Sequence, residues 1–183
     1  MAKGLWRSTF IGGFIAWLWI VISWTIIPWH CPIMNSFPNE AENVKTITSM
    51  VGTSGIYMSP NQCSGMATKP AAKSPIVFLS VNMSGNSDNT IIPYVISLII
   101  YFIGALLIAL VIMQMASSGY GSKLFAVTMI GLVIGFMAML PGWNWMGYPF
   151  NFVLLMIVDS LIAWFLAGLV IAGFVHPKHH KEK

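Results

Sequence analysis

Long apolar runs separated by short polar stretches dominate the pattern of this chain. Four such runs lie at residues 10–28, 91–115, 124–140 and 150–175. Each is near or above the roughly 18 apolar residues that indicate a helix crossing a membrane. Because every backbone N–H and C=O must be paired inside the hydrocarbon, runs of this length are expected to be helical. The pattern therefore predicts an integral membrane protein with four transmembrane helices.

The polar stretch between the first and second apolar runs is too long for an unstructured connection in a compact protein. Apolar residues recur in it at helical spacing over positions 41–51, after Ser36 and Asn39, either of which can cap a helix. Two β-rich runs, 55–59 and 76–82, are bounded by Gly, Pro and Ser and predict a two-stranded hairpin. The predicted fold class is an all-α membrane protein: a four-transmembrane-helix bundle with a small α+β extracytoplasmic domain in the first outer loop.

The basic residues lie beside the apolar runs and indicate how the chain crosses the membrane. Cytoplasmic segments close to helix ends are enriched in Lys and Arg. Six of the nine basic residues fall on one predicted side: Lys3, Arg7, Lys123, Lys178, Lys181 and Lys183. Both termini are therefore expected in the cytoplasm, with the long loop on the other side. The first run ends without the small residues of a cleavage site, so we expect an uncleaved anchor rather than a signal peptide.

These boundaries divide the chain into four parts. Residues 1–28 form the cytoplasmic N-terminus and the first transmembrane helix, and residues 29–90 form the extracytoplasmic loop domain. Residues 91–175 contain transmembrane helices two to four, and residues 176–183 form a basic cytoplasmic tail. The turn between the second and third runs is short, so these two helices are expected to be antiparallel neighbours. Pro141 is expected to end the third.

Composition excludes several classes of function. The chain is 57% hydrophobic and 8% charged, whereas soluble proteins carry about 25% charged residues. Its net charge of +4 does not predict nucleic-acid binding, because the basic residues lie beside the spans rather than on one face. The sequence contains no phosphate-binding loop, no HExxH motif and no Ser/His/Asp set. We therefore expect a protein that is not an enzyme and has no cofactor.

Asp159 is the one formally charged side chain inside the four apolar runs. A charge in a span costs roughly 2.5–3.5 kcal/mol on insertion scales, which makes an intramembrane carboxylate a functional candidate. The favoured interpretation is a structural lock between the fourth and third spans, through Thr128, Asn144 or Ser160. The alternative is an ion or proton site.

Small residues at four-residue spacing indicate faces on which helices approach closely. The strongest such motif is the pair Gly131 and Gly135 in the third span. Weaker pairs lie in the first and fourth spans: Gly12 with Ala16, and Ala163 with Ala167. The sequence leaves open whether the Gly131 face packs inside the bundle or between subunits.

The two cysteines, Cys31 and Cys63, both fall in the predicted outer loop. In an oxidising compartment they can form a disulfide that closes a loop of about 30 residues, worth about 3 kcal/mol. Two free thiols are the alternative. Together with His30, Met34 and Met66 they also supply soft ligands of the type that bind Cu(I). The spacing matches no recognised site, so no metal is expected.

Four segments stand out along the chain: SGIY at 54–57, PIVFLSV at 75–81, PGWNW at 141–145 and DSLIAWFLAGLVIA at 159–172. Together they resemble a family of small, uncharacterised bacterial inner-membrane proteins. The resemblance covers most of the chain and implies a multi-pass protein of the bacterial inner (plasma) membrane with a periplasmic outer loop. It implies no particular activity. Asp159 and Trp164 both belong to the resembling stretch in the fourth span.

The expected function is that of a non-catalytic accessory, assembly or scaffold subunit that packs against other membrane proteins or against itself within the lipid bilayer. Spans lined by Gly and Ala with few polar groups favour this over a transport pathway, which needs more polar lining. One alternative is a small transporter or channel subunit that uses Asp159. A weaker alternative is periplasmic metal or redox handling by the outer loop.

Overall fold

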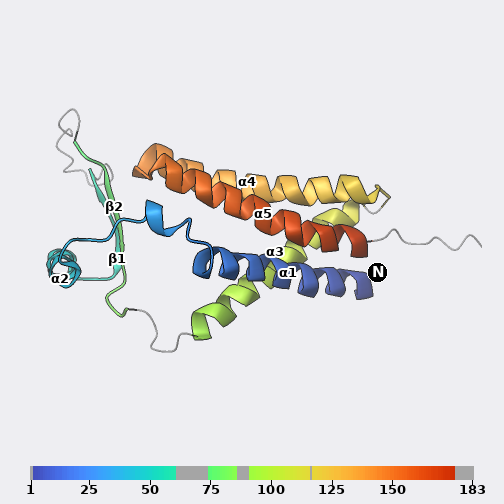
Figure 1. Cartoon of the computed structure of the whole chain (residues 1–183), viewed down its shortest axis with the longest axis horizontal. Coiled ribbons are helices and arrows are strands. Elements are labelled where there is room, and N and C mark those ends of the chain that lie inside the picture. The colour runs from blue at the N-terminus through green and yellow to red at the C-terminus, as the bar shows by residue number, and fades with distance from the viewer. Residues whose placement is uncertain (1, 61–73, 86–90, 116, 176–183) are drawn as a thin grey trace, which may run out of the picture.

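The computed structural model of the chain describes residues 2–60, 74–85, 91–115 and 117–175. Four of its helices are long and apolar enough to cross a membrane, so the chain is a multi-pass membrane protein, as predicted. In chain order the elements are α1 (Ala2–Thr25), the short 3₁₀ helix η1 (Cys31–Ile33), α2 (Glu40–Val51), β1 (Gly55–Ser59), β2 (Val77–Val81), α3 (Ile91–Gln114), α4 (Tyr120–Met146) and α5 (Phe150–Phe174) (Figure 1).

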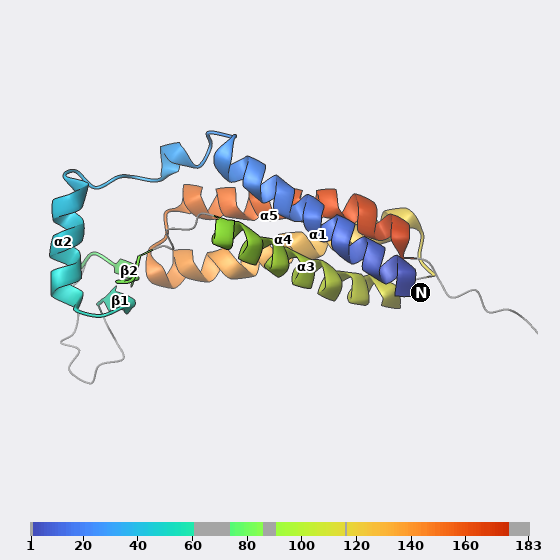
Figure 2. The ribbon, with the colours of Figure 1, turned by 90° about the horizontal axis from the view of Figure 1, so that it is seen from below.

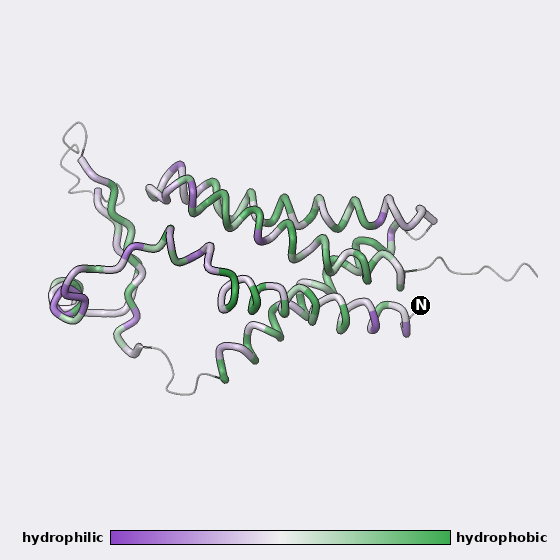
Figure 3. Tube along the Cα trace, in the orientation of Figure 1, coloured by the Kyte–Doolittle hydropathy of each residue, from purple (hydrophilic) through white to green (hydrophobic). Residues whose placement is uncertain are grey.

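The four long helices lie side by side in one apolar body. Helix α4 packs mainly along α5, α5 also packs on α1, and α1 also packs on α3 (Figure 2). The start of α1 lies at one end of this body, and α2, β1 and β2 lie beyond the other, which we call the loop end. Hydrophobic residues dominate the long helices, whereas polar residues gather in α2 and the connections at the loop end (Figure 3).

The core of the membrane body is built largely from small side chains, which let helices approach closely. All four long helices contribute to it. Its buried residues in these helices are Ala16, Ala105, Ile108, Ala109, Ile112, Val127, Ala163, Trp164, Ala167 and Ile171.

The Gly131 face packs inside the protein, against α5. A Cβ atom on Gly131 would lie 2.5 Å from the Cβ of Trp164, and one on Gly135 would lie 3.0 Å from the Cα of Ile157. The hydroxyl of Ser160 donates to the carbonyl of Gly131 at 2.9 Å. In the first span, a Cβ on Gly12 would lie 2.7 Å from Cγ1 of Ile171.

Two expectations about the third span are wrong. Helix α4 continues through Pro141 to Met146 and ends at Gly147, whose φ of +75° turns the chain in the left-handed region. Proline removes one backbone donor but does not forbid the following residues from staying helical. The second wrong expectation is that α3 and α4 pack along each other as neighbours. They make few contacts, because a short turn constrains only the ends that it joins.

The elements at the loop end form the predicted helix and hairpin. Strands β1 and β2 pair antiparallel, with Gly55 opposite Val81 and Ser59 opposite Val77. The hydroxyl of Tyr57 donates to the carbonyl of Val51 at 3.0 Å and joins the hairpin to α2. Asn39 occupies the N-cap position of α2, but its side chain makes no capping hydrogen bond.

The hairpin also contacts the membrane body. The ring of Phe78 on β2 lies 6.0 Å from the ring of Tyr148, edge to face, in the connection between α4 and α5. Gly147 lies close to the side chain of Ile76, which a Cβ on that glycine would approach to 3.3 Å. These contacts place the hairpin at the ends of α4 and α5.

Candidate functional site

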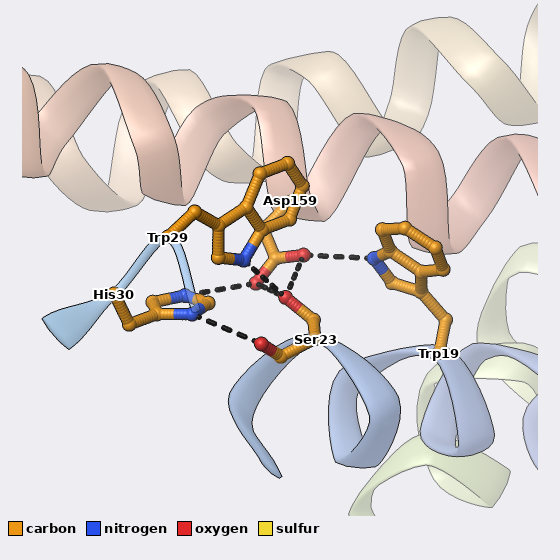
Figure 4. Close-up of polar contacts among 5 residues, drawn as sticks. All are labelled: Trp19, Ser23, Trp29, His30 and Asp159. Carbon is orange, nitrogen blue, oxygen red and sulfur yellow. Dashed lines mark hydrogen bonds and ion pairs between the residues drawn. The ribbon is translucent and has the colours of Figure 1, made fainter. Parts of the chain in front are cut away.

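Asp159 is buried on α5, with 2% of its surface exposed. The indole N–H of Trp19 donates to its Oδ1 at 2.7 Å. The hydroxyl of Ser23 lies 2.8 Å from Oδ1 and 2.9 Å from Oδ2. Nε2 of His30 lies 3.4 Å from Oδ2. Both oxygens of the carboxylate therefore have partners from the same chain (Figure 4).

A second layer of contacts holds these partners in place. The indole N–H of Trp29 donates to the hydroxyl of Ser23 at 3.0 Å. Nδ1 of His30 lies 3.2 Å from the backbone carbonyl oxygen of Ser23. The ring of Trp24 stacks on the imidazole, with ring centres 4.1 Å apart. We call Trp19, Ser23, Trp29, His30 and Asp159 the Asp159 cluster.

The local sequence explains how the cluster forms. Trp19 and Ser23 are four residues apart on α1 and so lie on the same helical face. Helix α1 ends at Thr25, and Pro28 follows within three residues, where a helix cannot easily continue. The chain turns there and brings Trp29 and His30 over the end of α1, against α5 (Figure 4).

The cluster joins the end of α1 to an inner position of α5. The 24 residues of α1 extend about 36 Å as a helix, slightly more than the roughly 30 Å of hydrocarbon in a bilayer. Ser23 lies two residues before the end of that helix. Asp159 itself follows the start of α5 by nine residues, so it lies about 14 Å along that helix, inside the apolar layer.

The expected partners of Asp159 were wrong. Ser160 instead donates to the carbonyl of Gly131, and Thr128 donates to the carbonyl of Leu124 within its own helix at 2.8 Å. Asn144 is exposed. The carboxylate joins α5 to α1 and to the connection after α1, not to α4. His30 was missed as a partner because it lies outside the apolar runs and nothing in its spacing signals Asp159.

The structure does not support the predicted disulfide. Cys31 is an exposed free thiol, and Cys63 lies outside the described residues. Met66 also lies outside them. Among the residues that the structure describes, no group of three or more His, Cys, Asp or Glu side chains is placed to hold a metal ion.

A second buried charge, which sequence reasoning also missed, lies at the end of the body opposite the loop end. Lys123 near the start of α4 is 4% exposed, and its Nζ donates to the backbone carbonyl of Val175 at 2.6 Å. Val175 is the residue after α5, where unpaired helix carbonyls favour a positive charge. The α4–α5 pair is thus fastened there by a cation.

Comparison with protein families, curated proteins and solved structures finds no match to this chain. The interpretation of the site therefore rests on its geometry. A buried carboxylate with donors on both oxygens is suited to holding helices and a loop together.

Proposed function

We propose that this protein is a non-catalytic accessory, assembly or scaffold subunit of a membrane complex. It binds its partner through the elements at the loop end, which are α2, β1 and β2. The observation that supports this proposal most strongly is that the side chains at the loop end are not buried within the protein. Among the described residues of 31–60 and 74–85, none is buried. Ile56 is 63% exposed and Met50 is 80% exposed.

A helix and a two-stranded hairpin without buried side chains gain little stability from their own packing. An isolated hairpin is marginal in water, and both edges of a two-stranded sheet keep unpaired backbone groups. Exposed apolar residues on such elements are typical of surfaces that another protein covers. Another membrane protein or a second copy of this chain is the expected partner.

The geometry of Asp159 argues against the alternative of a transporter or channel. A transported ion or proton needs access to the carboxylate, and 2% of the residue is exposed. Its oxygens already accept hydrogen bonds from Trp19 and Ser23. The metal or redox alternative would rest on Cys31, whose thiol has no described partner for such chemistry.

The proposed location is the bacterial inner membrane, with both termini cytoplasmic and residues 29–90 periplasmic. The basic residues beside the spans and the family resemblance support this orientation. Labelling Cys31 in intact cells with a membrane-impermeant maleimide tests it, because this exposed thiol reacts only if the loop end is periplasmic.

The proposed function is tested by photo-crosslinking at native expression level. The protein is then extracted in a mild detergent, and the molecular mass of the complex is measured. A photoreactive residue at Ile56 should crosslink to one protein present in fixed ratio, either a partner or a second copy. The matched control is Leu107 on α3, which is also apolar and 58% exposed but lies in a span. A lone monomer with no protein crosslink at Ile56 would contradict the proposal and favour flux assays with Asp159→Asn.

A further inference from the structure

Trp164 brings a polar donor to the middle of the membrane body. It lies about 21 Å along α5 from the start of the helix and about 15 Å from its end. Tryptophan is enriched at the two membrane interfaces, where its N–H meets polar groups, rather than at this depth. The side chain is almost entirely buried, with 6% of its surface exposed. Its N–H therefore needs an acceptor within the apolar layer.

The indole N–H of Trp164 makes no hydrogen bond within the part of the chain that the structure describes. By contrast Ser160, one turn earlier on α5, donates to the carbonyl of Gly131 at 2.9 Å. The indole nitrogen of Trp17 also lacks a described partner, but that atom is fully enclosed by the protein. The Trp164 nitrogen is not enclosed in this way, so a ligand can reach it.

Two glycines border the edge of the indole that carries this N–H. A Cβ on Gly131 of α4 would lie 3.1 Å from Cδ1, and a Cβ on Gly104 of α3 would lie 3.2 Å from Cζ2. In an indole ring the nitrogen is bonded to Cδ1 and to the carbon that carries Cζ2. Because glycine has no side chain, neither residue covers the nitrogen. The N–H edge therefore lies between α3 and α4, which make few contacts with each other.

Tyr101 adds an aromatic face and a second polar group beside this edge. Its ring centre lies 6.1 Å from that of Trp164, with an angle of 36° between the planes. It precedes Gly104 by three residues on α3, so the two lie on neighbouring parts of one helical face. Its hydroxyl, like the N–H of Trp164, forms no hydrogen bond with any described residue.

These groups select the chemistry of a ligand. Hydrocarbon contains no acceptor, and the polar parts of bilayer lipids lie outside the core, which is roughly 30 Å thick. The flank of a partner helix fits poorly, because only 6% of Trp164 is exposed and a slender group is needed to reach its nitrogen. A carbonyl oxygen on a flat ring meets both conditions. Its oxygen accepts from the indole, and its ring packs against Tyr101.

We propose that Trp164, Tyr101, Gly104 and Gly131 bind a neutral, lipid-soluble ligand with a ring carbonyl, the chemistry of an isoprenoid quinone. The carbonyl accepts a hydrogen bond from the N–H of Trp164, and the hydroxyl of Tyr101 supplies a second donor. The two glycines admit the ring between α3 and α4, and the apolar tail extends into the bilayer. This inference concerns binding alone and does not depend on the proposed function.

The first test uses a defined probe, a benzoquinone that carries a photoreactive azide and a short isoprenoid tail. In lipid nanodiscs the probe should label the protein saturably, and an excess of the same quinone without the azide should suppress the labelling. Mass spectrometry should place the label on α3 or α4 near Gly104 and Gly131. Labelling that does not saturate, or that is spread over the exposed faces of all four long helices, would overturn the proposal and leave a partner helix as the source of the acceptor.

The second test uses variants that remove one polar group each. Tyr101→Phe removes the hydroxyl and keeps the ring, and Trp164→Phe removes the N–H and keeps an aromatic side chain. Each should raise the probe concentration for half-maximal labelling about three- to tenfold, the effect of losing one neutral hydrogen bond. The matched control Trp17→Phe removes an N–H that is enclosed and should leave labelling unchanged.

Because Tyr101→Phe leaves the packing of the ring in place, it tests the site even where Trp164→Phe does not fold. Unchanged labelling in a folded variant of either residue would overturn the proposal.

Discussion

The indole nitrogen of Trp19 on α1 lies 2.7 Å from Oδ1 of Asp159 on α5, which are separated by 140 positions in the sequence. This hydrogen bond joins the first transmembrane helix to the last. With the hydroxyl of Ser23, it gives the buried carboxylate two donors from one helical face. The acid that the sequence singled out thus fastens α1 and the connection after it to α5.

Replacing Gly131 by Ala should destabilise the protein. The added Cβ would lie 2.5 Å from Cβ of Trp164, so α4 and α5 would have to move apart. Overpacking of this kind costs about 1–3 kcal/mol. Thermal unfolding in mild detergent measures the loss. The matched control is Gly121→Ala, where nothing lies within 4 Å of the added atom. Equal stability of the two variants would contradict close packing on this face.

Replacing Lys123 by Met should loosen the end of α5 opposite the loop end. Methionine fills a similar volume but leaves the carbonyl of Val175 without the donor that lies 2.6 Å away. A hydrogen bond to a charged group contributes about 1.5–3 kcal/mol. Chemical unfolding should show a loss in that range, and amide exchange near Val175 should increase. The control Lys45→Met removes an exposed charge on α2 and should change neither quantity.

Replacing Ile56 by Asp should abolish partner binding and leave the fold intact. Ile56 is 63% exposed, so a charge there costs the isolated protein little, within about 0.5 kcal/mol. The same charge opposes burial of the hairpin under a partner. The mass of the complex extracted in mild detergent reports on partner binding, and the thermal stability of the variant reports on its folding. The control Ser84→Asp adds the same charge at an exposed polar position and should keep the complex. A complex that survives Ile56→Asp would contradict binding through the hairpin.

The elements that depend on local pattern could be predicted from the sequence. The lengths of the apolar runs predicted all four long helices, because hydrocarbon forces such runs to be helical. The strands at 55–59 and 77–81 followed from β-rich runs bounded by turn residues. Pro141 was misleading because the helix accommodates the missing donor and ends later, at Gly147.

The candidate site could be predicted only in part. Asp159 was identified because a charge inside an apolar run is costly. Its partners depend on the turn after Thr25, which brings His30 back to α5 from outside any apolar run. The role of Lys123 likewise depends on where α5 ends. Contacts between residues so far apart in the chain cannot be predicted from the spacing of residue types.

A double-mutant cycle between Trp19 and Asp159 tests most directly whether this acid joins α1 to α5. Trp19→Phe removes the donor and keeps an aromatic ring, and Asp159→Asn removes the charge and keeps the shape. The free energy of unfolding is measured for both single variants and the double variant in the same lipid nanodiscs. A coupling energy of about 1 kcal/mol or more is the expected result for residues that share a buried hydrogen bond. Additive effects of the two substitutions would contradict the structural lock.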